Sequence, residues 1–296
     1  MDASTRTFLA HRPRLRSLAY RMLGSVAEAE DVVQDTWLRW QEADPAAIET
    51  PEAWLVTATS RLSIDRLRAL KRQRADYPGL WLPEPIATGE ASTASPEDTL
   101  ERLGEVSAAL LALLERLTPE ARAAFLLREV FDADYADIAR LLGTSEANCR
   151  QRVLRARRAL GDAVPARPAS ADEHRRLVEA FADAAASGRF DALQELLAAD
   201  AELRGDGGGR VRSVGHPLHG ARRIAQLYLA TFLRHRARQR LAVVELNGRP
   251  GLLRFIDGRL ESAQSLVVAQ GRITRLDVQR NPEKLRRLAA AFEPGA

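Results

Sequence analysis

The chain has 296 residues and a mass of 32.7 kDa, which at ordinary domain sizes suggests two or three domains. Hydrophobic residues make up 46% and charged residues 28%, so there is enough apolar material for packed cores. The sequence has no run near the roughly 18 apolar residues that span a bilayer, no signal-peptide core at its N-terminus, and a single cysteine, Cys149. These features exclude a membrane-spanning protein, a disulfide framework and a cysteine-rich zinc site, and we expect a cytosolic chain without a metal or a cofactor.

The first part of the chain predicts two helical domains. Residues 1–72 have helical periodicity and no strand-like alternation. The stretch 73–105 contains YPGLWLPEP and then a run rich in Pro, Gly, Ser and Thr, which is typical of a linker. Residues 106–162 are again helical in pattern. We therefore expect two all-α domains on either side of a linker.

Residues 118–160 predict three short helices in succession. Thr118-Pro119-Glu120 favours the start of the first, Asp134 can cap the second, and Gly143 separates the second from a third that Ser145 can cap. The third helix carries one apolar stripe, formed by Cys149, Val153, Ala156 and Leu160. A short helix, a turn with glycine and an amphipathic helix predict a helix-turn-helix, whose last helix suits a DNA major groove.

The charge of this last helix favours nucleic acid as its partner. The segment from Ser145 to Arg158 holds five arginines and one acidic residue, so its net charge equals that of the whole chain, +4. A basic stripe on a short helix is an electrostatic footprint for nucleic acid. A solvated face on an ordinary helical hairpin would have the same composition, and the pattern alone leaves that interpretation open.

The C-terminal part has a different pattern, after a short linker at 163–171. Residues 172–296 begin with helical segments and continue with alternating apolar segments that are typical of strands. The expected turns between these strands each contain a glycine: Asn247-Gly248, Asp257-Gly258 and Gln270-Gly271. We expect an α+β domain.

Several long motifs together resemble a known family. LRSLAYRMLGSVAEAEDVVQDTWLRW at 15–40, PEAWLVTATSRLSIDRLR at 51–68 and the whole of 117–160 resemble the sigma-70 superfamily. More narrowly, they look like extracytoplasmic-function sigma factors, which keep only the second and fourth sigma domains. The C-terminal part resembles the SnoaL-like domain, of the NTF2-like fold, that sigma-J-like members carry.

Three further motifs carry this narrower resemblance. They are a WLPEP motif at 81–85, a DGGGK-like motif at 206–210 and an NPDKL-like motif at 281–285. The chain departs from the last two by charge-preserving changes, with Arg210 in place of Lys and Glu283 in place of Asp. Because arginine does not readily lose its proton, a role that needs a neutral amine at position 210 is in doubt.

The resemblance implies a multidomain fold with two all-α sigma domains, the second with a helix-turn-helix, and a C-terminal α+β NTF2-like cone. It assigns residues 1–72 to sigma domain 2, 73–105 to a linker, 106–162 to sigma domain 4 and 172–296 to the SnoaL-like domain. The implied partners are core RNA polymerase, through the clamp helices of its β′ subunit, and promoter DNA. No membrane is expected as a partner.

The implied contacts fall on three short sets of residues. The set that would bind core polymerase lies on an acidic and amide helix face beside apolar anchors, which suits a helical partner: Asp31, Gln34 and Asp35. The set that would read the −10 element, with the loop at 41–50, supplies stacking, hydroxyl and phosphate contacts: Trp54, Thr57, Ser60 and Arg61. The set that would read the −35 element opens the third helix of the helix-turn-helix: Glu146, Asn148, Arg150, Gln151 and Arg152.

The C-terminal domain is expected to regulate rather than to catalyse. Its regulatory contacts would join the WLPEP motif to the two later motifs, through Trp81, Pro83, Asp206, Arg210, Asn281 and Lys284. NTF2-like cones enclose a pocket, so a small-molecule ligand of this domain is a further expectation.

Two other classes of protein stay open from the sequence. One is a ligand-sensing helix-turn-helix repressor, which leaves residues 15–68 unexplained. The other is a DNA-binding protein with an active SnoaL-type cyclase or isomerase domain. Its acid–base pair would come from Asp206, His216, His219 and Asp257, but no spacing among them singles out a pair, and we expect no enzyme activity.

Overall fold

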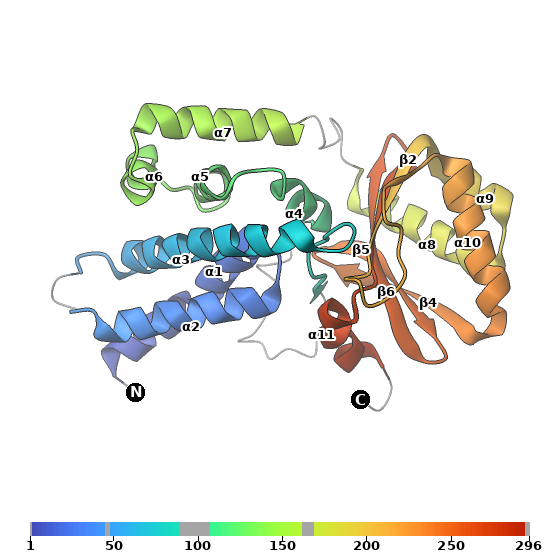
Figure 1. Ribbon diagram of the computed structural model, residues 1–296, viewed down its shortest axis with the longest axis horizontal. Helices are drawn as coiled ribbons and strands as arrows, with labels where there is room; N and C mark the ends of the chain where they lie inside the picture. The colour runs from blue at the N-terminus through green and yellow to red at the C-terminus, as the bar shows by residue number, and fades with distance from the viewer. Residues whose placement is uncertain (1, 45–47, 89–106, 162–168, 294–296) are drawn as a thin grey trace. The chain divides into compact units, whose positions relative to one another are not determined.

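The computed structural model describes residues 2–44, 48–88, 107–161 and 169–293 (Figure 1). The chain forms two compact units, the first from Met1–Ala75 with Leu111–Ala163 and the second from Asp76–Leu110 with Val164–Ala296. Residues 89–105 of the expected linker and 163–168 of the short linker lie outside the described residues. The part of the expected linker from Asp76 to Thr88 belongs to the second unit, where Ala87–Thr88 forms strand β1.

The first unit begins with three long helices: α1 (Ala3–Leu23), α2 (Val26–Glu42) and α3 (Pro51–Gln73). Asp2 caps α1 by accepting a hydrogen bond from the Thr5 amide at 2.6 Å, and Gly24 ends the helix in the left-handed region at φ 68°. Pro51 stands in the first turn of α3, where its missing N–H costs nothing. Leucines such as Leu15, Leu55 and Leu67 are fully buried and form the core of this bundle.

Four shorter helices follow in the described part of the chain: α4 (Ala108–Leu114), α5 (Pro119–Glu129), α6 (Tyr135–Leu142) and α7 (Glu146–Gly161). They belong to the first unit from Leu111 onward. Thr118 caps α5 through the Ala121 amide, and Gly143 ends α6 at φ 61°. Asp134 stands at the N-cap of α6, but its side chain makes no capping hydrogen bond. The predicted apolar stripe of α7 is confirmed, since its buried residues are Cys149, Val153, Ala156 and Leu160. The helix-turn-helix predicted from the sequence is thus α6, the turn at Gly143 and α7.

The second unit is an α+β fold around one mixed sheet, as predicted. The helices are α8 (Ala171–Ser187), α9 (Phe190–Leu196), α10 (Ala221–His235) and α11 (Pro282–Phe292). The strands are β1 (Ala87–Thr88), β2 (Leu197–Asp206), β3 (Leu218–His219), β4 (Gln239–Leu246), β5 (Arg249–Ile256), β6 (Arg259–Ala269) and β7 (Arg272–Gln279). Their order in the sheet is β1-β4-β5-β6-β7-β2-β3, and only β2 and β7 pair in parallel. Short 3₁₀ turns occupy Arg74–Asp76 and Arg236–Arg238.

The three hairpins that join β4 to β7 follow the predicted turns. In each two-residue turn both residues have positive φ, for example 52° at Asn247 and 71° at Gly248. That conformation matches the twist of the flanking strands and requires residues such as Asn, Asp and Gly. The turn chemistry therefore fixes the register of the meander.

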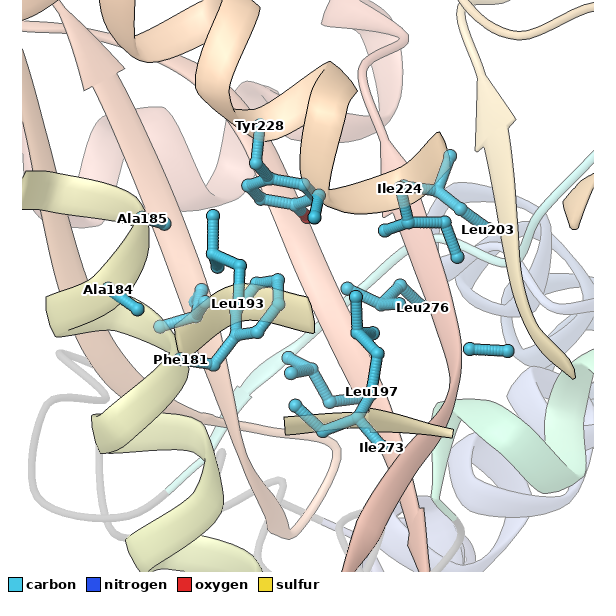
Figure 2. Close-up of a cluster of buried hydrophobic side chains, with 14 of the residues drawn as sticks. Phe181, Ala184, Ala185, Leu193, Leu197, Leu203, Ile224, Tyr228, Ile273 and Leu276 are labelled. Atoms are coloured by element: carbon cyan, nitrogen blue, oxygen red, sulfur yellow. The ribbon is translucent and has the colours of Figure 1, made fainter. Parts of the chain in front are cut away.

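The sheet has a core on each face. Helices α8, α9 and α10 cover one face and α11 packs on the other (Figure 1). Figure 2 shows the larger core, in which Phe181 of α8 meets Tyr228 of α10 edge-on, with ring centroids 4.8 Å apart. Leu193 and Ile224 are fully buried beside them, and each such side chain contributes about 1.5–3 kcal/mol by leaving water. On the other face Leu285 and Leu288 of α11 cover Leu253 and Phe255 of β5.

Candidate functional site

The predicted −35 residues lie on the first two turns of α7. Glu146, Asn148, Arg150 and Gln151 are exposed, and Arg152 is half-buried. Ser145 caps the helix by accepting from the Asn148 amide at 3.3 Å, while the Asn148 side chain donates to Thr144 Oγ1 at 3.2 Å. The first turn of α7 therefore presents amide, carboxylate and guanidinium groups from a fixed backbone, as readout of base edges requires.

Two neighbours hold Arg150 at the surface. Its Nη2 donates to Glu146 Oε2 at 2.7 Å, and its guanidinium carbon lies 5.1 Å from the ring centroid of Tyr135. The ion pair is exposed and Tyr135 is half-buried, so these contacts orient the guanidinium at the surface. A base or phosphate at this position would compete with the exposed Glu146 carboxylate.

We expect Arg150→Ala to weaken binding of a promoter duplex by about 1–3 kcal/mol if Arg150 contacts a guanine edge. The measurement is the affinity of the polymerase-bound chain for a promoter and for variants changed at each −35 position. A matched control is Arg140→Ala, since Arg140 is exposed and pairs with Asp137 on α6. An unchanged −35 preference in the Arg150 variant would remove this residue from the interface.

The predicted −10 residues share α3 but differ in accessibility. Arg61 is exposed and Thr57 is half-buried. Trp54 is also half-buried and packs on Trp40 of α2, with ring centroids 5.5 Å apart. Residues 45–47 of the expected DNA-reading loop lie outside the described residues.

Ser60 requires a correction. Its side chain is 1% exposed, and its hydroxyl donates to the Val56 carbonyl at 2.7 Å. A serine inside a helix often satisfies its hydroxyl in this way, on the carbonyl four residues earlier. Position 60 also faces the core with Ser63 and Leu67, so Ser60 does not offer its hydroxyl to DNA as predicted.

The predicted polymerase-binding residues lie on the outer side of α2. Asp31, Gln34 and Asp35 are all exposed, and the buried Val32 and Val33 anchor the helix behind them. Leu38, one turn further on, is 49% exposed. Gln34 also lines a groove of about 510 Å³ between α1 and α2, together with Phe8, Leu9 and Trp37. The groove is also lined by charged side chains, those of Arg12, Arg16 and Glu30. An exposed leucine beside such a mixed groove and carboxylates suits contact with a protein partner.

Asp206 is the centre of the predicted regulatory contacts. It ends β2, is fully buried, and accepts hydrogen bonds from the Tyr77 hydroxyl at 2.6 Å and the Leu82 amide at 2.9 Å. Lys284 of α11 donates to it at 2.6 Å, and Gln279 of β7 at 3.2 Å. Burial and the neighbouring carboxylate raise the pKa of the Tyr77 phenol, so this hydroxyl stays a donor. One carboxylate thus joins the WLPEP segment to three later elements of the fold.

Lys284 also contacts the WLPEP segment directly. Its Nζ donates to the Leu82 carbonyl at 2.6 Å and lies 4.1 Å from the ring centroid of Trp81. Gln279 adds hydrogen bonds to the carbonyls of Leu82 and Pro83, at 3.2 and 3.3 Å. The backbone of the WLPEP segment is therefore bound as well as its aromatic ring. The lysine gains both an ion pair and a cation–π contact.

Asn281 and the glycines of the second motif meet at this cluster. Asn281 caps α11 by accepting from the Glu283 amide at 3.0 Å, and its amide nitrogen donates to the Tyr77 hydroxyl at 3.2 Å. A Cβ on Gly208, which has φ of 61°, would come within 2.3 Å of the Asn281 side chain. Only glycine fits there, because of both its φ and its missing side chain.

The two departures from the family motifs pair with each other. Arg210 and Glu283 are both exposed and form an ion pair at 3.1 Å. Arg210 thus lies at the rim of the cluster around Asp206 and not among its buried donors. The sequence does not single out Tyr77 or Gln279, although both bind Asp206; Tyr77 opens the YPGLWLPEP stretch, and this proximity is the one signal that points to it.

The residues considered for an acid–base pair occupy separate surroundings. Asp206 is committed to the cluster just described, His219 lies exposed in β3, and Asp257 forms an exposed ion pair with Arg238 at the β5–β6 turn. His216 is exposed in the segment before β3. A second buried polar group in this unit comprises Tyr228, Gln264 and Ser262, in which the Tyr228 hydroxyl donates to Gln264 Oε1 at 2.6 Å. Burial raises the pKa of Tyr228 to about 12.

Among the described helices, none combines the length and the apolar character that crossing a membrane requires.

Comparisons with known proteins match both units. The family model described as Sigma-70 region 2 matches residues 7–73, and that described as Sigma-70, region 4 matches residues 107–160. The ECF RNA polymerase sigma factor SigJ of Mycobacterium tuberculosis (strain ATCC 25618 / H37Rv) is 36% identical over 291 residues, which are 94% of this chain and 91% of SigJ. The probable ECF RNA polymerase sigma factor SigI of Mycobacterium tuberculosis (strain CDC 1551 / Oshkosh) is 33% identical over 99% of each chain.

The fold agrees with a solved structure over nearly its full length. The crystal structure of the Mycobacterium tuberculosis extracytoplasmic function sigma factor SigJ is similar with a TM-score of 0.76 at 33% identity. The match covers 95% of this chain and 98% of that one. The similarity therefore includes the sheet-containing unit as well as the helical one.

Proposed function

Because the chain belongs to the extracytoplasmic-function sigma factors of the sigma-70 family, we propose that it binds core RNA polymerase and directs it to promoters. Asp31, Gln34 and Asp35 of α2 would contact the clamp helices of the β′ subunit. The first turns of α7 would read the −35 element, and α3 would hold the −10 element. The observation that carries this proposal is the exposure of these faces on elements that match both sigma-70 regions.

The proposed mechanism has no chemical step in this chain. Polymerase supplies the catalysis, and the chain supplies promoter choice and strand opening. Opening requires a base to leave the stack, at a cost of roughly a few kcal/mol. The chain carries two elements that would bind DNA, α7 and α3. Binding of one raises the effective concentration of the other at its site, and the added binding energy offsets part of the cost of opening. In this role the protein would act with RNA polymerase in the cytoplasm. The role requires neither a small-molecule ligand nor catalysis by this chain.

The direct test is transcription in vitro with core polymerase and a library of genomic promoter fragments. We expect the full chain to bind core polymerase and to start transcripts from a defined subset of fragments. Asp35→Ala and Gln34→Ala should reduce polymerase binding without changing the subset. A chain that binds palindromic duplex DNA by itself and shows no affinity for core polymerase would instead fit a helix-turn-helix repressor.

We also propose that the second unit modulates promoter use through the cluster around Asp206. Five donors converge on this one carboxylate. The Gly208 amide is local, and the other four lie more than 70 residues away in sequence: Tyr77, Leu82, Gln279 and Lys284. Such a contact holds the segment between the two sigma regions against the second unit. The path of the WLPEP segment then depends on whether its hydrogen bonds to the cluster around Asp206 are formed or broken.

Truncation tests the regulatory proposal. Ending the chain after residue 170 removes every partner of the WLPEP segment in β2, β7 and α11, and ending it after residue 285 keeps Lys284 but removes the packing of Leu288 and Phe292. We expect both truncations to change transcription from the selected promoters, the first more strongly. Equal transcription from all three chains, at equal occupancy of core polymerase, would contradict the proposal.

A further inference from the structure

The exposed side of α3 continues beyond the candidate −10 residues as a charged row. Its members recur at spacings of three or four and therefore share one helix face: Arg61, Asp65, Arg68 and Arg72. All four side chains are exposed. From Arg61 to Arg72 the helix rises roughly 16 Å at about 1.5 Å per residue. That length matches about five nucleotides, at about 3.4 Å of axial rise per nucleotide of one strand.

One arginine of this row is bound by a carboxylate from α5. Arg68 Nε and Nη2 both donate to Glu120 Oε1, at 2.9 and 2.6 Å, and Nη1 donates to Asp65 Oδ1 at 2.9 Å. Glu120 lies in the first turn of α5 and is the less exposed of the two acids, at 26% against 72% for Asp65. Arg68 therefore binds Glu120 with two N–H groups of its planar fork, and the same fork can bind phosphate oxygens.

Two cations at the C-terminal end of α3, Lys71 and the C-cap residue Arg74, are bound by the segment just before Glu120. Lys71 donates to the carbonyls of Glu115 and Leu117, at 3.2 and 2.6 Å. Arg74 donates to Glu115 Oε2 at 2.8 Å. Residues 115–120 thus present a series of oxygen acceptors to the basic end of α3. An oxygen-rich strand alongside a basic helix is also what a nucleic-acid backbone would supply.

We propose that Arg68 binds a backbone phosphate of the promoter strand that lies along α3, and that Glu120 occupies this position in the free chain. The inference rests on the proposed function, since it continues the same DNA path along the helix. Glu120 competes as a tethered group, so its effective concentration is high and free DNA binds poorly. Once the chain is on polymerase and DNA reaches α3, a phosphate replaces the carboxylate.

The experiment uses the full chain, first alone and then bound to core polymerase. The probe for the free chain is a labelled single-stranded DNA of mixed sequence, followed by fluorescence anisotropy over a range of salt. We expect Glu120→Gln to tighten binding about two- to fivefold, the range of one exposed ion pair. The gain should vanish in the double variant with Arg68→Ala. Glu245→Gln is the matched control, because it removes the same charge from an exposed pair with Arg175 in the second unit.

With the chain bound to core polymerase, the salt dependence of promoter affinity measures the phosphate contact directly. Arg68→Ala should weaken all promoters alike and reduce the dependence of log affinity on log salt by about 0.7–0.9, the value for one lost contact. Arg175→Ala should leave this slope unchanged. A Glu120→Gln gain no larger than that of Glu245→Gln, or an unchanged slope in Arg68→Ala, would overturn the inference. If the wild-type chain failed to bind core polymerase, the proposed function would fall while the anisotropy arm still decided the competition between Glu120 and DNA.

Discussion

Asp206→Asn is expected to release the WLPEP segment and to destabilise the second unit by about 3–5 kcal/mol, the cost of leaving a buried charge without its partner. Lys284 is the group that loses its buried ion-pair partner, because its side chain is only 12% exposed and that of Asp206 is fully buried. The substituted amide nitrogen would also face the Leu82 amide, so that two donors oppose each other. Tyr77 could still donate to the remaining oxygen.

Hydrogen exchange in the full chain measures both consequences. We expect the amides of Leu82 and Ile86 to lose protection first, with Trp81 fluorescence shifting toward that of a solvated indole. Asp257→Asn is the matched control, since it makes the same chemical change in an exposed pair with Arg238, where the cost is about 0–1 kcal/mol. Equal protection in the two variants would show that the cluster does not hold the segment.

Arg122→Ala should destabilise the first unit, again by about 3–5 kcal/mol. The Arg122 side chain is fully buried, and its Nε donates to the Arg21 carbonyl at 3.0 Å. That carbonyl belongs to the last turn of α1, where carbonyls lack partners inside the helix. Arg122 also forms an ion pair with Glu115. The substitution therefore leaves a cavity and removes a donor from the Arg21 carbonyl. Among the described residues, it leaves Glu115 with Arg74 as its ion-pair partner.

The expected result is loss of hydrogen-exchange protection in α1 and α5 together, since Arg122 connects them. Arg140→Ala, in an exposed pair on α6, should leave both helices protected. Arg122→Met restores much of the volume but not the charge, and it separates the packing contribution from the hydrogen bonds. Protection lost in α5 but retained in α1 would contradict the connecting role of Arg122.

The elements that local chemistry determines were predictable from the sequence. The stripe of Cys149, Val153 and Ala156 follows from helical spacing alone, and Asn247-Gly248 fixes a hairpin because few other pairs adopt positive φ twice. Ser60 shows where prediction from local sequence fails. A hydroxyl near the edge of a helix face suits either a core or a surface, and its burial depends on neighbours from other helices.

Contacts between distant segments were not predictable in detail. The motifs identify Asp206 and Lys284 as a group, but their direct pairing depends on β7 bringing α11 back beside β2. Arg122 gives no signal in the sequence, since arginine is usually a surface residue. Its burial depends on a carbonyl of α1 about a hundred residues earlier in the chain.

Strand β1 has a consequence for the solubility of the sheet-containing unit. It pairs antiparallel with β4, and the Thr88 hydroxyl accepts from the Gly248 amide at 2.9 Å. The Ile86 carbonyl accepts from the Asn247 amide at 2.8 Å. An uncovered edge strand is a template for pairing with other chains. A fragment that begins after the linker would expose β4, so this short segment also protects the sheet against self-association.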